Sequence, residues 1–338
     1  MRISVYIPLL VTALLAVLAP RAARRPAPRP AAWSLACAAL VTATGWLGSL
    51  ALLAFTGFAQ IPEVAEEGHW SVAALRTQDP VSLAVAAVSA LTLAAGLVSL
   101  GVAAVRQVRH VLWARRECGR VPGDTELAVL DDDAPQAFAL PGAPGRIVVS
   151  RGMLRCLGDQ EREALLAHER AHLRGRHHLF QTVWRLAAAV NPLLRPLAEA
   201  GGFVLERWAD EEAAASIGSR TVVARAVGRA ALASAGASRP AALAATGGAV
   251  PQRVQALLAP PPPRRTLPFV AGALLLTLCC GSLANAASDS ESLVDGAERA
   301  QCAADAGAPG ASWAGRAPQL PDACCDHREA GEHGSHRR

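Results

Sequence analysis

The chain has 338 residues, of which 52% are hydrophobic and only 18% are charged, and its formal net charge is +5. A soluble domain carries charge on about a quarter of its residues, so this composition indicates a membrane protein. All positive side chains are arginines clustered beside apolar runs, which favours membrane orientation over nucleic-acid binding. The eight cysteines form no C-x-x-C pair, which argues against a zinc ribbon or a thioredoxin-type site.

Four apolar runs predict membrane-spanning helices, at residues 3–19, 33–59, 81–105 and 266–286. Each approaches or exceeds the roughly 20 residues that cross a bilayer. The first run could instead be a cleaved signal peptide. Its arginines, however, follow the apolar stretch, and Pro20 comes directly after its end, which is unfavourable for cleavage. We therefore expect four spans, and a protein that is mainly α-helical and integral to the membrane.

Arginines flank the apolar runs in the loop 20–32, in the segment from 106, and at Arg264-Arg265. The positive-inside rule puts these three segments on the cytoplasmic side. The sequence thus predicts a multi-pass protein of the cell membrane with both termini extracytoplasmic. The block 106–265, between the third and fourth spans, is expected in the cytoplasm, and residues 287–338 form a tail that we expect to be disordered and outside.

Three short apolar runs separated by turn residues indicate a small sheet early in this block, at 127–130, 137–140 and 146–149. If one strand is an exposed edge beside a catalytic centre, it can hold a substrate peptide by strand addition. A purely structural hairpin explains the pattern equally well.

The stretch His168-Glu169-Arg170-Ala171-His172 reads H-E-x-x-H and lies in a pattern with helical spacing. The helix is expected to begin near Asp159 and to stop at Gly175. Both imidazoles then share one face and can reach one metal ion, while Glu169 can touch a water beside the metal. This pattern predicts one bound Zn²⁺ with Glu169 as the catalytic base. An ordinary polar helix face can carry the same five residues.

The third metal ligand has two candidate positions. His178 completes the longer metzincin pattern, but no methionine follows it to form the Met-turn of that class. Glu206 would complete a His₂Glu site with an open fourth position, and Asp210 could accept the free N–H of a ligand histidine. Spacing alone does not separate Glu206 from other nearby acids, which are Glu199, Glu211 and Glu212.

Several stretches in chain order resemble the membrane-embedded gluzincin peptidases. They are 137–142, 146–154, the H-E-x-x-H motif, and Glu206 with Asp210 as an E-x-x-x-D motif. The resemblance implies an α+β zinc-peptidase domain with His168, His172 and Glu206 as the zinc ligands. It also implies catalysis by Glu169 and a supporting role for Asp210. Two groups share these motifs: the CAAX-processing and heat-shock membrane proteases, and the BlaR/MecR-type antirepressor peptidases.

The peptidase block between a third and a fourth span looks more like the BlaR/MecR group, as does the stretch 253–258 before a proline-rich linker. This resemblance implies an endopeptidase that cleaves a protein or peptide substrate, such as a transcriptional repressor. The tail contains no Ser-x-x-Lys motif, so beta-lactam acylation by that chemistry is excluded. The alternative is a non-catalytic membrane signal transducer or scaffold that keeps the peptidase fold.

Two expectations concern side chains and helices around the motif. His177, His178 and Arg207 are candidates for stabilising the oxyanion, because the single tyrosine, Tyr6, lies in the first span. Residues 180–190 form an apolar-rich helix that either packs on the domain core or docks on the bilayer surface.

Overall fold

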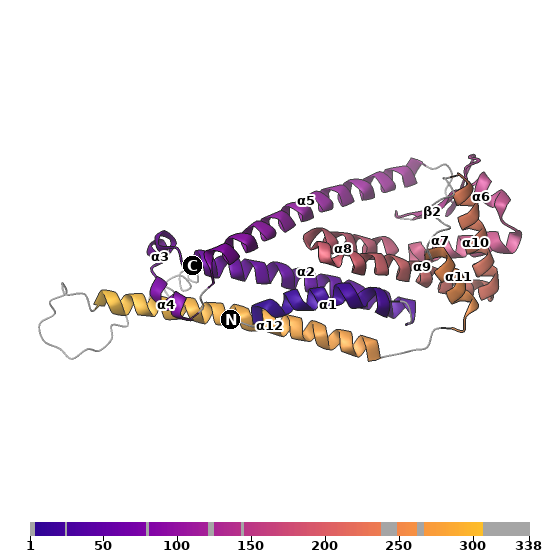
Figure 1. Ribbon diagram of the computed structural model, residues 1–338. Helices are drawn as coiled ribbons and strands as arrows, with labels where there is room; N and C mark the ends of the chain where they lie inside the picture. The colour runs from indigo at the N-terminus through magenta and orange to yellow at the C-terminus, as the bar shows by residue number, and fades with distance from the viewer. Residues whose placement is uncertain are drawn as a thin grey trace, which may run out of the picture.

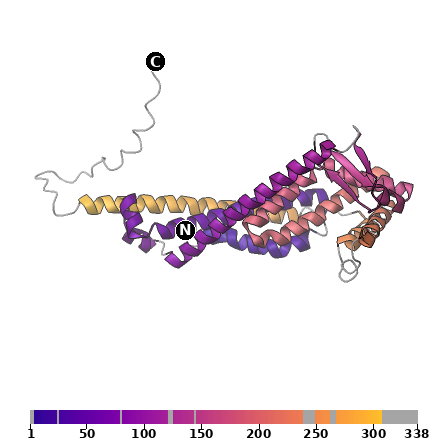
Figure 2. The ribbon, with the colours of Figure 1, turned by 90° about the horizontal axis from the view of Figure 1, so that it is seen from above.

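The computed structural model describes residues 4–23, 26–78, 81–120, 125–142, 145–237, 249–261 and 267–306. The molecule is elongated, with long helices along most of its length and a smaller α+β unit at one end (Figure 1). A 90° turn shows the same two parts (Figure 2). The α+β unit is the block predicted between the third and fourth apolar runs.

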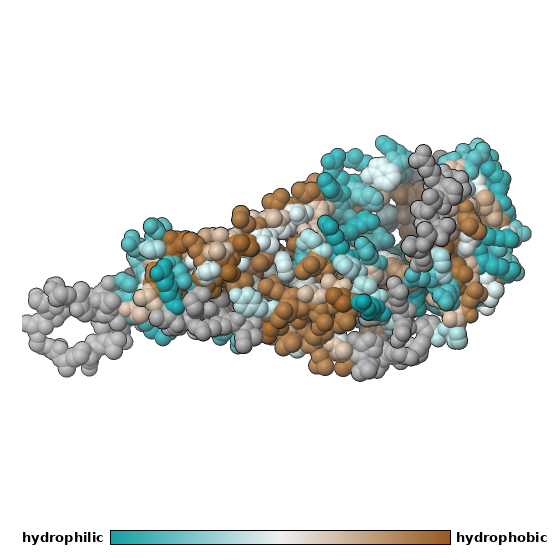
Figure 3. Space-filling view, viewed as in Figure 1, coloured by the Kyte–Doolittle hydropathy of each residue, from teal (hydrophilic) through white to brown (hydrophobic). Residues whose placement is uncertain are grey.

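Four helices within the described residues are long and apolar enough to cross a membrane. They are α1 (Ile7–Ala22, preceded by the 3₁₀ turn η1, Ser4–Tyr6), α2 (Pro28–Phe58), α5 (Leu83–Arg120) and α12 (Leu267–Ala306). Hydrophobic side chains cover much of the surface along this part of the molecule, whereas hydrophilic side chains gather at the α+β end (Figure 3). An apolar surface of this extent fits a lipid environment.

Three of the predicted spans are parts of longer helices, α2, α5 and α12. α2 begins at Pro28, and α5 continues beyond the apolar run to Arg120. The arginines that end the apolar run of α5 are good helix formers, so they mark a polar boundary without ending the helix.

Residues 287–306 were expected to be disordered, and this expectation is wrong. They form the second half of α12, which packs against the short helix α4 (Val72–Gln78) that follows α3 (Pro62–Gly68). Ala297 is buried beside Leu75, and its carbonyl accepts a hydrogen bond from the Ser71 N–H at 3.1 Å. Burial against α4 therefore stabilises a segment whose composition suggested a free tail. Residues 307–338, the rest of the tail that was expected to be disordered, lie outside the described residues.

The three predicted strands are present as β1 (Leu127–Leu130), β2 (Ala137–Leu140) and β3 (Arg146–Ser150). The sheet order is β1-β3-β2, with β1 parallel and β2 antiparallel to β3. β2 is thus an edge strand. The Ser150 N–H donates to the Gln136 carbonyl at 2.9 Å, and hydrogen-bonded positions alternate along an antiparallel pair, so the backbone groups of Ala137 and Ala139 face the open edge.

Seven helical elements complete the unit. They are α6 (Arg151–Cys156), α7 (Asp159–Arg174), α8 (His177–Val190), the 3₁₀ turn η2 (Pro192–Leu194), α9 (Arg195–Ile217), α10 (Arg220–Ala237) and α11 (Ala249–Leu258). α7 contacts the sheet, α9 and α10. The H-E-x-x-H helix is therefore central to the α+β unit.

α7 begins at Asp159 and ends at Arg174, so Gly175 caps the helix at the expected position, although it is not the left-handed residue of the turn. Gly175 has a φ of −74°, and Arg176 is the left-handed residue, with a φ of 49°. Gly175 is required for another reason, because a Cβ there would lie 2.5 Å from Nε2 of His177. The glycine thus makes room for the His177 ring against the end of α7.

Candidate metal centre

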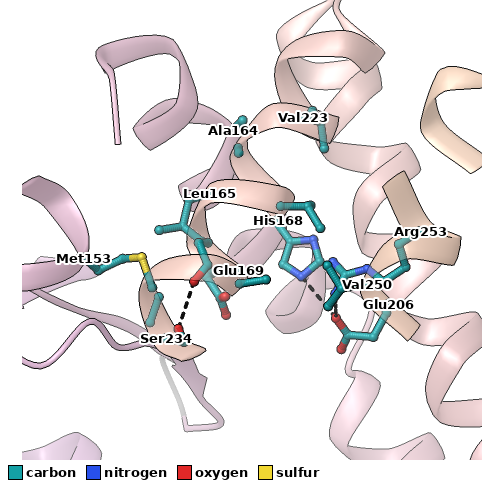
Figure 4. Close-up of a pocket in the computed structure, with 15 residues that line it drawn as sticks. Met153, Ala164, Leu165, His168, Glu169, Glu206, Val223, Ser234, Val250 and Arg253 are labelled. Carbon is teal, nitrogen blue, oxygen red and sulfur yellow. Dashed lines mark hydrogen bonds and ion pairs between the residues drawn. The ribbon is translucent and has the colours of Figure 1, made fainter. Parts of the chain in front are cut away.

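His168 and His172 project from one face of α7 toward Glu206 on α9. One donor atom from each of the three lies within 4.8 Å of the others. The two Nε2 atoms are 3.1 Å apart, and each lies 3.6 Å from a carboxylate oxygen of Glu206. Two imidazoles and one carboxylate from two helices thus converge on a single point, and Figure 4 shows His168 and Glu206 there.

The donor set fits zinc in kind and spacing. Zinc–nitrogen bonds of about 2.0–2.1 Å at a tetrahedral angle hold two nitrogens about 3.3 Å apart. The observed separation of the two Nε2 atoms, 3.1 Å, differs from this by a few tenths of an ångström. Three protein donors leave a fourth position open, as in catalytic zinc sites.

Glu169 points into a cleft of about 270 Å³ that His168, Glu206 and Arg253 also line (Figure 4). Its carboxylate accepts a hydrogen bond from the backbone N–H of Ala139 on the edge strand β2, and its burial raises its pKa. A carboxylate with a raised pKa beside a metal site can accept and return a proton near neutral pH.

Charged side chains support His168. Its Nδ1 lies 3.0 Å from Oδ1 of Asp210, and that carboxylate is 2% exposed. Arg253 from α11 donates to both Asp210 oxygens, at 2.8 and 2.7 Å, and its Nη1 lies 2.8 Å from Oε2 of Glu206. Arg253 thus compensates the buried Asp210 carboxylate and the partly buried Glu206 carboxylate at once.

A neutral side chain supports His172. Nδ1 of His177 lies 2.8 Å from Nδ1 of His172, so one of these atoms must carry the shared proton. If Nε2 of His172 faces a metal, its Nδ1–H is the donor and His177 accepts. His177 is 1% exposed, its ring packs 4.6 Å from that of Trp208, and burial together with the charge of His172 lowers its pKa to about 3. His177 is therefore a neutral acceptor.

Protonation differs across the three converging side chains. Burial lowers the pKa of His168, but its hydrogen bonds with Asp210 and Glu206 outweigh burial and raise it to about 9. Burial and the charge of His168 lower the pKa of His172 to about 4. For Glu206, the raising effect of burial is outweighed by His168 and Arg253, and its pKa falls to about 2. His172 and Glu206 thus present lone pairs at neutral pH.

Of the candidate third ligands, the structure brings only Glu206 to the two histidines among the described residues. His178 lies outside this group. Its pKa is lowered by burial and by the charges of Arg176 and Arg115. The remaining acids are engaged elsewhere or exposed: Glu211 pairs with Arg220, Glu212 accepts from Trp208, and Glu199 is at the surface.

The sequence-derived oxyanion candidates do not line the cleft. His177 lies behind His172, and Arg207 donates to the carbonyls of Ala23 and Pro26, both at 3.4 Å. Arg253 is the arginine that lines the cleft, and the sequence patterns did not identify it as a site residue. Arg253 and Asp210 are 43 residues apart, and no local pattern connects two helices at that distance.

Comparison with known proteins supports a metalloprotease. The model of peptidase family M48 matches residues 104–250, from α5 to the start of α11. Protease HtpX homologues are similar over part of this region. That of Gemmatimonas aurantiaca is 39% identical over 70 residues, covering 20% of this chain and 25% of the relative. That of Desulforapulum autotrophicum is 33% identical over 94 residues, covering 27% and 30%.

A third HtpX homologue, from Thermococcus sibiricus, is 34% identical over 82 residues and is covered to 27% of its length. The chain therefore spans less than a third of these relatives, and no solved structure matches it. The gluzincin motifs, the candidate metal site and the apolar helices agree with these similarities. The region 104–250 is thus similar to peptidase family M48 and, over part of its length, to HtpX proteases.

Proposed function

We propose that this protein is a membrane-anchored zinc endopeptidase. The observation that carries the proposal is the convergence of His168, His172 and Glu206 with Glu169 in the same cleft. The three donors would hold one Zn²⁺. A non-catalytic scaffold would need neither the buried base nor the compensated carboxylates behind the donors.

The mechanism assigns one role to each side chain. Zinc in such a site supplies Lewis-acid chemistry, by which water becomes a nucleophile at neutral pH and a carbonyl is polarised. Glu169 takes the proton of the attacking water and passes it to the leaving amine. Asp210 and His177 hold the ring orientations of His168 and His172, respectively.

The substrate would bind as an extended peptide along β2. Ala137 turns its N–H and carbonyl, and Ala139 its carbonyl, to the open edge of the sheet, and Ala137 lines the cleft. Glu169 bonds the N–H of Ala139, so the base is fixed beside this edge. Strand addition gives affinity through main-chain hydrogen bonds, largely independent of the substrate sequence.

We assign the catalytic unit to the cytoplasmic side, with both termini outside. The C-terminal ends of α1 and α5 and the N-terminal ends of α2 and α12 lie at the end of the molecule that carries the α+β unit (Figure 1). The arginine-rich segments belong to these same ends, which is the distribution that the positive-inside rule associates with the cytoplasm.

A regulatory role is the finer part of the proposal. Helices α1, α2 and α5 precede the peptidase unit and α12 follows it, which is the order on which the resemblance to BlaR/MecR-type antirepressor peptidases rests. The substrate would then be a transcriptional repressor. Trapping with the Glu169→Gln protein in cells, followed by identification of the bound proteins, tests this part.

The activity is tested with the purified full-length protein in vesicles and an unstructured protein substrate. Glu169→Gln should keep its zinc and lose about 10²–10⁴-fold in turnover, the usual contribution of a general base. Glu163→Gln, an exposed acid on the same helix, is the matched control and should keep wild-type turnover. A zinc chelator should abolish cleavage. Full activity of Glu169→Gln would overturn the mechanism, and zinc binding without cleavage or trapping would favour the scaffold.

A further inference from the structure

The segment α8–η2–α9 forms a helical hairpin that runs back from the α+β unit among the long helices (Figure 1). α8 contacts α2 and α5, and α9 contacts α1 and α2. The hairpin is not one of the four candidate spans. Its position therefore has to be explained by its contacts rather than by its hydropathy.

Two contacts with α5 measure how far the hairpin extends. Near its base, Gln107 Nε2 donates to Thr182 Oγ1 at 2.8 Å, just past the end of the apolar run of α5. At its tip, the Val190 carbonyl oxygen lies 3.1 Å from where a Cβ on Gly96 would be. Eleven residues of α5 separate these levels, which at about 1.5 Å per residue is roughly 16 Å. That distance is about half of the ~30 Å hydrocarbon thickness of a bilayer.

Contacts with α2 agree with this depth. Trp33, at the start of the apolar run of α2, packs edge-on against Phe180 with ring centroids 4.9 Å apart. The buried cluster that contains Phe180, Val190 and Leu194 continues along α2 as far as Ala43. The hairpin thus enters beside the polar ends of the spans and stops near their middle.

The tip satisfies its own backbone donors, as a chain in lipid must. The Asn191 N–H donates to Ala187 O at 3.0 Å, and the Leu194 N–H donates to Asn191 O at 2.9 Å. The Leu193 N–H donates to the Asn191 side-chain oxygen at 3.0 Å. Pro192 has no N–H, so every amide from 191 to 194 is accounted for without water. The side chain of Leu193 is nevertheless 46% exposed.

We propose that the α8–η2–α9 hairpin is inserted into the membrane to about mid-depth, with Leu193 against lipid acyl chains. The inference rests on the long helices crossing a bilayer and does not depend on proteolysis. Both arms meet the metal site, because α8 starts at His177 and α9 carries Glu206. The membrane would therefore hold the helix of one proposed ligand, Glu206, and the helix of the supporting ring of His177.

Three exposed side chains on the hairpin are charged, and each carries an energetic cost wherever it faces hydrocarbon. Arg185 lies three residues beyond Thr182, about 5 Å deeper along α8, so its flexible side chain can extend to the polar boundary. Arg195 and Glu199 lie four residues apart on α9, a spacing that lets opposite charges pair in lipid, although they form no ion pair among the described residues.

The test places a photoreactive benzoylphenylalanine at Leu193 in the full-length protein, reconstituted in phosphatidylcholine vesicles. Matched positions are Val98, an exposed residue on the apolar part of α5, and Leu232, an exposed residue on α10 of the α+β unit. After irradiation, mass spectrometry should find phospholipid adducts at 193 and 98 and none at 232. Adducts at 98 but not at 193 would overturn the proposal. If the 193 variant fails to fold, the same label at the exposed Pro192 decides.

A second measurement concerns the link from the hairpin to the metal site. A side chain at Gly96 must displace Val190, whereas nothing lies within 4 Å of a Cβ at Gly101 on the same helix. Gly96→Leu should lower zinc affinity several-fold, and Gly101→Leu should leave it unchanged. Equal affinities in the two variants would exclude the coupling. Neither assay reads proteolysis, so failure of the proposed activity would not alter these outcomes.

Discussion

The two histidines of the metal site are supported by different chemistry. Behind His168 lies a buried ion pair, in which Asp210 is 2% exposed and Arg253 is 12% exposed. Behind His172 lies the neutral ring of His177, packed on Trp208 and continuous with the hairpin. The ion pair behind His168 connects α7 to α11 by charge. The ring of His177 behind His172 connects α7 to the helices at membrane level by packing.

This difference predicts unequal sensitivity to substitution. A buried charge that loses its partner remains unsolvated, which is strongly destabilising. A neutral acceptor that is lost leaves one unsatisfied N–H, which costs less. Substitutions of Asp210 or Arg253 should therefore be poorly tolerated. At position 177, any residue that restores a hydrogen-bond acceptor for His172 should be tolerated.

The largest effect is expected for Arg253→Leu. Removing the guanidinium leaves the buried Asp210 carboxylate uncompensated, so the free energy of unfolding should fall by about 3–5 kcal/mol. Thermal unfolding of the detergent-solubilised protein measures the loss. Arg151→Leu is the control, because its ion pair with Asp131 is exposed on both sides and is worth at most about 1 kcal/mol. Equal losses in the two variants would contradict the role of burial.

Asp210→Asn keeps the size of the side chain and removes its charge. Since supporting carboxylates of this kind contribute about 10–100-fold to metal affinity, the zinc dissociation constant should rise by that factor. Competition with a chelator measures it. Asp159→Asn, on the exposed first turn of α7, should leave zinc affinity unchanged. An unaltered affinity for Asp210→Asn would mean that His168 is held by packing alone.

Local patterns were sufficient to predict the parts of the site that lie close together in sequence. The strands 127–130 and 137–140 followed from apolar runs between turn residues, and helical spacing placed His168 and His172 on one face of α7. Glu206 was favoured over its neighbours by the resemblance to a known family, since spacing alone left four acids open.

Contacts between distant segments explain what could not be predicted. Arg253 reaches Asp210 from another helix, and His177 turns back under His172 because Gly175 leaves room for its ring. The second half of α12 is a further case, since its composition suggested disorder and its packing on α4 is not visible in the sequence. These features depend on tertiary packing, which single-sequence propensities do not encode.

His177→Phe should have a smaller effect than Asp210→Asn. The ring volume is kept, but the acceptor for Nδ1–H of His172 is lost, so zinc affinity should fall by about 10-fold, the lower end for such supports. His177→Asn can restore an acceptor and should recover part of the affinity. His178→Ala is the control and should bind zinc normally, because His178 lies outside the donor group. Zinc loss in His178→Ala with none in His177→Phe would revive the metzincin pattern.

The smallest effect is expected for Glu161→Gln. This variant tests whether the stability lost with an ion pair depends on the burial of its arginine or on pairing itself. Glu161 accepts from the Gly158 N–H at 3.0 Å and pairs with Arg229 at 2.8 Å, but Arg229 is 59% exposed, unlike Arg253. Burial raises the pKa of Glu161, and these partners more than reverse that rise, so its pKa is below the ordinary 4.5.

A carboxyl with a depressed pKa contributes stability above its unfolded value and loses that contribution as the pH falls through the folded value. Glu161→Gln should therefore cost about 1 kcal/mol at pH 7, and this difference should shrink below pH 4.5. Thermal unfolding at pH 7 and pH 4 measures both values. A cost as large as that of Arg253→Leu would show that pairing, rather than burial, decides how strongly each carboxylate is held.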